Sequence, residues 1–197
     1  MTTCATICPS QKTLTQNDLL TAKLLTFFKR NDFEPLKIML DVINGESSIS
    51  LRIIDWFSTN YAKKNYTLYE MTNQTGEKNR FKVYFDYKLK LKAYSKKRFD
   101  PFCRWDRISI PYKNGTYIET TIGQLNFFKW ALENKVINYI DENYDMIEKD
   151  MNNRNSTSKR KEGITDNSKT RKKREELSIS ATKSIKKEEV EIVVKFH

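Results

Sequence analysis

Residues 121–147 carry the feature that most constrains the fold of this chain. Thr121 is followed three positions later by Gln124, which matches the capping-box pattern at the start of a helix. Large apolar residues then recur at spacings of three or four: Leu125, Phe128, Leu132, Val136, Ile140, Tyr144 and Ile147. This periodicity predicts an amphipathic helix, either continuous or divided near Asn138, whose apolar stripe must pack on a core.

Three shorter helices are predicted in the first third of the chain. Each begins at a capping residue or a proline and carries large apolar residues three or four positions apart. The first is expected to be capped by Asn17 or Asp18 and to end near residue 30. The second should begin at Pro35 and stop at Gly45. The third should begin after residues 47–50 and carry an apolar stripe from Ile53 to Tyr61.

The next segment begins as a polar loop and continues as a strand. Residues 63–79 are mostly polar and include Gly76, which predicts a loop. Phe81, Val83, Phe85 and Tyr87 then alternate with polar residues. Strict alternation predicts a strand with one buried side, and we expect Phe81, Phe85 and Tyr87 to lie in the core.

Two interpretations fit the residues after Tyr87. The alternation formally continues, which would give an unusually long strand. Tyr87, Leu91 and Tyr94 also have the i, i+4, i+7 spacing of a helix from about residue 87 to 97, and we favour this strand-then-helix order. Either element ends before Pro101, because the residue before a proline avoids the helical region.

A β-hairpin is predicted between this region and the long helix. Residues 107–112 and 116–121 are β-prone and flank Asn114 and Gly115. An Asn-Gly pair in this position is a strong hairpin signal.

The chain is therefore expected to contain one α+β domain, residues 14–151, after a flexible leader of residues 1–13. Residues 152–188 are rich in Ser, Thr, Lys and Glu and nearly lack large apolar side chains, so they predict a disordered basic tail. Residues 189–197 are β-prone again and are expected either to add to a sheet edge or to bind a partner protein. No stretch approaches the length of a membrane span, so no membrane association is expected.

Charge is concentrated in one stretch. The chain has a net charge of +11, and residues 78–107 contain eleven Lys and Arg against three Asp, whereas the rest of residues 1–151 is net negative. Aromatic rings are interleaved with these cations, a mixture that suits phosphate backbones and unpaired bases. The candidate nucleic-acid-binding residues are Lys82, Tyr84, Lys88, Lys90, Lys92, Tyr94, Lys96, Lys97, Arg98, Phe102, Arg104, Trp105 and Arg107. Phe102 and Trp105 fit a core position equally well.

The tail carries two further basic clusters. Their spacing matches a bipartite nuclear-import signal and equally suits an auxiliary contact with nucleic acid. The clusters consist of Lys159 and Arg160, then Arg171, Lys172, Lys173 and Arg174.

Common catalytic and metal-binding patterns are missing from the sequence. His197 is the single histidine, and no glycine-rich phosphate loop is present. The three cysteines, Cys4, Cys8 and Cys103, predict free thiols rather than a zinc site or a disulfide framework. We therefore expect no catalytic residue, no metal and no cofactor. The remaining enzymatic alternative is a metal-dependent nuclease built on Asp86 and Lys88, with Asp55, Asp100 or Glu119 as further carboxylates.

Three blocks of sequence also resemble a known family. They are ISLRIIDWFSTNYAKKN at residues 49–65, LKAYSKKRFDPFCRWDRI at 91–108, and ETTIGQLNFFKWALENKVINYI at 119–140. Together they resemble an uncharacterised protein family of the nucleocytoplasmic large DNA viruses, the group that includes mimiviruses and phycodnaviruses. The resemblance implies a viral, intracellular setting and no activity.

Residues and resemblance together predict a non-enzymatic viral protein that binds DNA or RNA during replication, transcription or genome packaging. It would act in the nucleus or cytoplasmic virus factory of the infected cell. The alternative is a structural or assembly protein of the virion that docks on a viral partner through residues 189–197.

Overall fold

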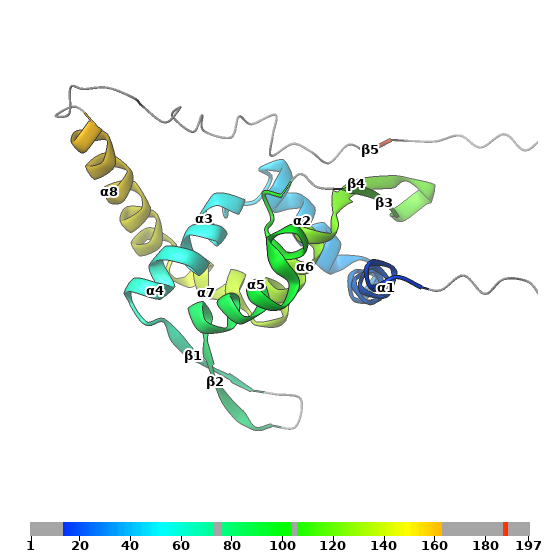
Figure 1. Cartoon of the computed structure of the whole chain (residues 1–197), viewed down its shortest axis with the longest axis horizontal. Helices are drawn as coiled ribbons and strands as arrows, with labels where there is room; N and C mark the ends of the chain where they lie inside the picture. Colours follow the sequence, from blue (N-terminus) through cyan, green and yellow to red (C-terminus); the bar gives the residue numbers. More distant parts are fainter. Residues whose placement is uncertain (1–13, 73–75, 104–105, 163–186, 189–197) are drawn as a thin grey trace, which may run out of the picture.

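The computed structural model shows an α+β fold in which helices pack around one central helix and two small antiparallel sheets lie at the periphery (Figure 1). It describes residues 14–72, 76–103, 106–162 and 187–188, with the side chains of Asn114, 155–162 and 187–188 left out. The predicted α+β class, with helices first, a hairpin next and a long amphipathic stretch after it, is confirmed.

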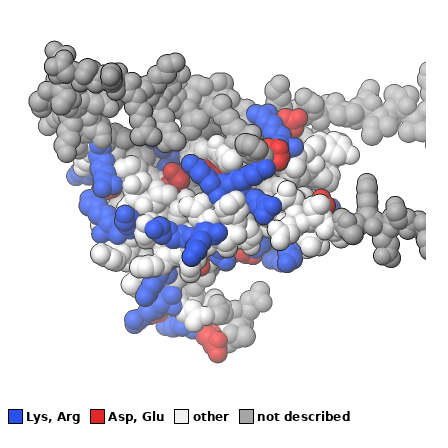
Figure 2. Space-filling model, viewed as in Figure 1, with Lys and Arg blue, Asp and Glu red and all other residues white. Residues whose placement is uncertain are grey.

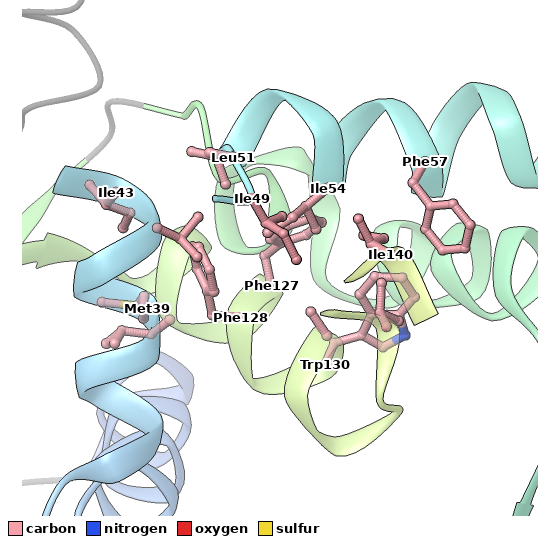
Figure 3. Close-up of a cluster of buried hydrophobic side chains, with 14 of the residues drawn as sticks. Met39, Ile43, Ile49, Leu51, Ile54, Phe57, Phe127, Phe128, Trp130 and Ile140 are labelled. Atoms are coloured by element: carbon pink, nitrogen blue, oxygen red, sulfur yellow. The ribbon is translucent and has the colours of Figure 1, made fainter. Parts of the chain in front are cut away.

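The central helix is α6, Ile122–Glu133, at the start of the predicted amphipathic run. Thr121 caps it, since its hydroxyl oxygen accepts a hydrogen bond from the Gln124 N–H at 3.1 Å. Most of α6 is buried, and Figure 3 shows Phe128 beside α2 and Trp130 beside Ile140. At Gly123 an added Cβ would lie 2.8 Å from the Asp100 carbonyl oxygen, so the missing side chain lets this end of α6 approach the chain after α5.

The long amphipathic stretch is divided twice, and not near Asn138 as one alternative held. A break follows α6 at Asn134 and Lys135, where Lys135 has φ 53°, and α7 then runs Val136–Glu142. The second break is at Asn143, and α8 covers Tyr144–Glu162. Helix α8 thus extends past residue 151, the expected end of the domain, as far as residue 162.

Helices α1, Gln16–Phe28, and α2, Glu34–Asn44, confirm the first two predicted helices. The cap of α1 is Thr15 rather than Asn17 or Asp18, because Thr15 and Asp18 satisfy each other's backbone N–H groups. Gly45 ends α2 in the left-handed conformation, as expected.

The third predicted helix is continuous in space but changes type. It begins as α3, Leu51–Trp56, capped by Ser50. It then passes through the π-helical turn η1, Phe57–Tyr61, into α4, Ala62–Lys64.

The predicted loop at residues 63–79 contains a strand. β1, Leu68–Thr72, pairs antiparallel with β2, Lys78–Lys82, and places Tyr69 opposite Phe81. Both rings turn inward: Tyr69 stacks on Tyr139 with ring centres 5.0 Å apart, and its hydroxyl donates to the Asn134 carbonyl oxygen at 2.6 Å. This anchor on α6 and α7 is why a polar segment forms a hairpin.

The favoured strand-then-helix order is confirmed, but the boundary lies at residue 83 rather than 87. α5 runs Val83–Phe99, with a non-helical Ser95 at φ 63° inside it. Val83 and Tyr87 are four positions apart, so they share one face in a strand and also share one face in a helix. The helix buries both of them against the core.

The predicted hairpin at residues 107–121 is also confirmed. β3, Arg107–Pro111, pairs antiparallel with β4, Tyr117–Thr121, around the turn η2, Lys113–Gly115. β5, Lys187–Glu188, pairs with the other edge of β4. Residues 1–13, 163–186 and 189–197 lie outside the described part, and within that part no helix is both long and apolar enough to cross a bilayer.

Candidate nucleic-acid interface

The predicted basic stretch lies on one face of the molecule. Figure 2 shows Lys and Arg spread over the face made by α4, α5 and the β1–β2 hairpin, with few Asp or Glu among them. Lys88, Lys92 and Lys96 point into solvent from α5, as the helical interpretation requires. Tyr87 is buried on the opposite side.

Cations at the C-terminal end of α5 are already paired with carboxylates. Lys96 lies 3.5 Å from Asp100, and Lys97 lies 3.5 Å from Asp106. Arg107 of β3 pairs with Glu119 at 3.4 Å. Arg98 is half-buried. A phosphate group would have to compete with these carboxylates for the cations, so the C-terminal end of α5 should bind an anion more weakly.

Cations at the N-terminal end of α5 are arranged differently. Within the described residues, Lys63, Lys82, Lys88, Lys90 and Lys92 have no carboxylate within 4.0 Å. These lysines therefore form no ion pair within this distance, and the acidic residue in the first turn of α5, Asp86, accepts instead from the Trp130 indole. The positive end of the α5 dipole lies at the same place.

Tyr84, in the first turn of α5, sits between two of these lysines. The Nζ atoms of Lys63 and Lys88 each lie 5.7 Å from the centre of its ring, a cation–π distance. Lys63 comes from α4, so the ring joins two elements that are distant in sequence.

A cavity of about 420 Å³ opens beside Tyr84, and we call it the Tyr84 pocket. Its volume falls in the range of about 300–1,000 Å³ that is typical of small-molecule sites. The walls come from α4, from the turn after it, from the paired ends of β1 and β2, and from the start of α5. The lining residues are Ala62, Lys63, Tyr66, Thr67, Leu68, Lys82, Tyr84 and Phe85.

Three large apolar or aromatic side chains that line the Tyr84 pocket are exposed to solvent: Tyr66 is 78% exposed, Phe85 59% and Leu68 50%. Leu89, one turn after Phe85 on α5, is 65% exposed. The prediction that Phe85 lies in the core is wrong, because α5 turns it away from α6 and toward the pocket mouth. Grouped exposure of this kind marks interaction surfaces.

The outer face of the β1–β2 hairpin extends the basic surface from the pocket. Lys82 pairs across the strands with Leu68, and Arg80 pairs with Glu70. These side chains are exposed, as is Lys78, whose Nζ lies 3.7 Å from Glu70. The hairpin thus carries three cations against one carboxylate on this face.

The other predicted aromatic residues pack against the core cluster, and half-buried Tyr84 also contacts it on one side. Tyr94 stacks on the buried Phe99 with ring centres 6.2 Å apart, and half-buried Phe102 packs against the core cluster. Phe81 also packs inward, as expected. Of the predicted rings that the structure describes, Tyr84 is the one beside lysines without a carboxylate partner.

Some predicted residues fall outside the described part of the chain: Arg104, Trp105, Arg171, Lys172, Lys173 and Arg174. Lys159 and Arg160 lie in α8, with side chains that are not described. Four residues that line the Tyr84 pocket were not predicted from the sequence as site residues: Lys63, Tyr66, Leu68 and Phe85. The available signal was Lys63 and Lys64 in α4, at the end of the third helix, with Tyr66 two residues later.

The carboxylates considered for a nuclease are not assembled around Asp86. The Asp86 carboxylate accepts a hydrogen bond from the buried Trp130 indole N–H at 2.6 Å. Burial raises the pKa of Asp55 to about 6, with a further contribution from Asp100, while Lys96 opposes the shift. Across the described ranges, no three Asp, Glu, Cys or His side chains lie close enough together to hold a metal ion.

The comparisons with known proteins agree with the resemblance found in the sequence. The chain is 42% identical over 157 residues to "Uncharacterized protein L507" of Acanthamoeba polyphaga mimivirus. The matched region covers 74% of this chain and 60% of the relative. The chain thus spans less than two thirds of that relative's length. No solved structure matches it. The predicted resemblance to an uncharacterised giant-virus family is confirmed, and because a family model matches residues 9–196, the chain belongs to the family of unknown function DUF7197.

Proposed function

We propose that this protein binds nucleic acid through the surface formed by α4, the β1–β2 hairpin and the N-terminal end of α5. It acts by binding rather than by catalysis, in replication, transcription or genome packaging, within the nucleus or virus factory of the infected cell. One observation carries the proposal: lysines without carboxylate partners surround exposed aromatic side chains at Tyr84. Lysines without a carboxylate partner attract phosphates through counterion release, and exposed rings attract bases.

The proposal is tested by fluorescence anisotropy with labelled single- and double-stranded oligonucleotides. We expect binding that weakens steeply between about 50 and 200 mM salt, because each phosphate contact releases a counterion. A protein that binds neither kind of oligonucleotide at low salt contradicts the proposal.

Charge reversal locates the interface. Exchanging Lys82 and Lys88 for Glu should remove binding, because these lysines have no carboxylate partner among the described residues. Exchanging Lys96 and Lys97 for Glu is the matched control on the same helix. It should weaken binding less, because their ion pairs with Asp100 and Asp106 already offset their charge.

The tail clusters add a second element to the proposal. Lys159, Arg160 and the basic group at 171–174 act as an auxiliary contact with nucleic acid or as a nuclear-import signal. A fluorescent fusion with the 171–174 group changed to Gln separates the two. Loss of nuclear accumulation with unchanged oligonucleotide affinity favours import.

A virion assembly role is the second candidate, and the exposed apolar side chains of Phe85 and Leu89 favour it. In that case the protein would be a stoichiometric component of purified particles, by mass spectrometry, and would bind no oligonucleotide.

A further inference from the structure

The Tyr84 pocket has the features of a site for a flat apolar group flanked by negative charge. Its volume of about 420 Å³ suits a small planar ligand, and its walls are mostly apolar and aromatic. Lys63 of α4 and Lys82 of β2 are among the residues that line it. A ligand that fills it must therefore be apolar at its centre and anionic at its edges.

Tyr66 shows that the mouth of the pocket is open to solvent. It follows the C-cap of α4 and takes the left-handed conformation at φ 48°, and the Thr67 N–H closes this helix end on the Ala62 carbonyl oxygen at 3.1 Å. Its ring is 78% exposed beside the pocket that it lines. The helix end thus places a solvent-exposed aromatic ring at the pocket.

From these observations we propose that the Tyr84 pocket receives an unpaired nucleobase, so that the protein prefers single-stranded nucleic acid to duplex. This inference rests on the proposed function and deepens it. In a duplex the faces of the bases are stacked on their neighbours and cannot reach Tyr66, Tyr84 or Phe85. An unpaired base offers its face to a ring, while Lys63 and Lys82 contact the adjoining phosphates.

The surroundings favour a polymer over a free nucleotide. Cations continue beyond the pocket in two directions, along the hairpin through Arg80 and along α5 through Lys88 and Lys92. A mononucleotide would leave these cations unused. A strand several nucleotides long would place a phosphate near each of them.

The test compares the full chain with three ligands in fluorescence anisotropy: a single-stranded oligonucleotide, the same strand with abasic sites at its centre, and a duplex of equal length. We expect the intact strand to bind most tightly. The abasic strand keeps every phosphate, so any loss of affinity for it measures the bases alone. Equal affinity for all three ligands overturns the inference and leaves the proposed function standing.

Ring variants test the pocket itself. Tyr66→Ala and Phe85→Ala remove exposed rings and should each weaken binding of the intact strand by roughly five- to 150-fold, the range for loss of one base–aromatic stack. The slope of affinity against salt should stay the same, because neither ring contacts a phosphate. Tyr117→Ala, which removes a 40% exposed ring from β4, is the matched control and should bind as the wild type does.

The outcomes separate the two levels of the proposal. Weaker binding by the ring variants together with weaker binding of the abasic strand supports the base pocket. Unchanged binding by the ring variants overturns it, even if Lys63→Glu removes binding. No binding of any ligand overturns the proposed function and the pocket together. Because the abasic strand is tested on the wild-type chain, the result does not depend on how well the variants fold.

Discussion

Asp55 should lower the stability of the folded chain at neutral pH. Burial, then repulsion by Asp100, raises its pKa from 3.8 to about 6, although Lys96 opposes the shift. The folded state therefore binds more protons than the unfolded state between about pH 4 and pH 6. Stability falls as pH rises through this window and stays low above it.

The magnitude follows from the size of the shift. One pKa unit corresponds to about 1.4 kcal/mol, so the ionised carboxylate costs the folded state on the order of 3 kcal/mol above about pH 7. Asp55→Asn keeps the size of the side chain and removes its titration. We expect the variant to exceed the wild type in free energy of unfolding by about this amount at neutral pH, and the gain to vanish near pH 4.

Urea unfolding followed by tryptophan fluorescence measures the difference at a series of pH values. The exposed Asp141→Asn on α7 is the control, since it removes one carboxylate without removing a buried charge. The reasoning is refuted if the Asp55→Asn gain does not change with pH, or if the variant is the less stable protein at neutral pH.

Three further predictions concern the packing of α5, α6 and the β1–β2 hairpin. Gly123→Ala should destabilise the fold by about 1–3 kcal/mol in urea unfolding, because the new Cβ would lie 2.8 Å from the backbone oxygen of Asp100. An unchanged urea midpoint would show that the start of α6 and the end of α5 can move apart without cost. Asp86→Ala should lower the free energy of unfolding by about 1–3 kcal/mol, because it leaves the Trp130 indole N–H without its acceptor. Asp86→Asn keeps an acceptor oxygen and should cost less. Equal losses for the two variants would contradict the role of Asp86 as the acceptor for Trp130. Tyr69→Phe should increase hydrogen exchange in β1 and β2 more than in α6, because it removes the hydrogen bond to the Asn134 carbonyl oxygen, and uniform exchange changes would count against the anchor.

The elements that could be predicted from sequence are those set by local patterns. The caps at Ser50 and Thr121, the stop at Gly45 and the hairpin around Gly115 each depend on residues within a few positions of one another.

The elements that were not predicted correctly from the sequence are those whose conformation depends on contacts with distant residues. β1 forms because Tyr69 packs on Tyr139, and nothing near Tyr69 signals that contact. α5 begins at Val83 because the helix buries Val83 and Tyr87 together, and the alternating pattern allows this as well as it allows a strand. The break before α7 lies at Lys135, a residue whose left-handed conformation has no signal in its type.

The candidate site was predicted in composition but not in position. The sequence showed that residues 78–107 combine lysines with rings, and Lys82, Tyr84 and Lys88 do line or flank the pocket. It could not show that Lys96 and Lys97 pair with carboxylates. Lys63 and Tyr66 come from another part of the chain, and the fold brings them beside Tyr84.

The salt dependence of single-strand binding tests the central claim most directly. Measured by anisotropy, the slope of log affinity against log salt should fall in magnitude by about 0.7 for each phosphate contact removed. The account predicts a fall of about 1.4 for Lys63→Gln with Lys82→Gln, and a clearly smaller change for Lys96→Gln with Lys97→Gln. Equal slopes for the two pairs, or a larger change for the second pair, would contradict the claim that nucleic acid binds at the N-terminal end of α5.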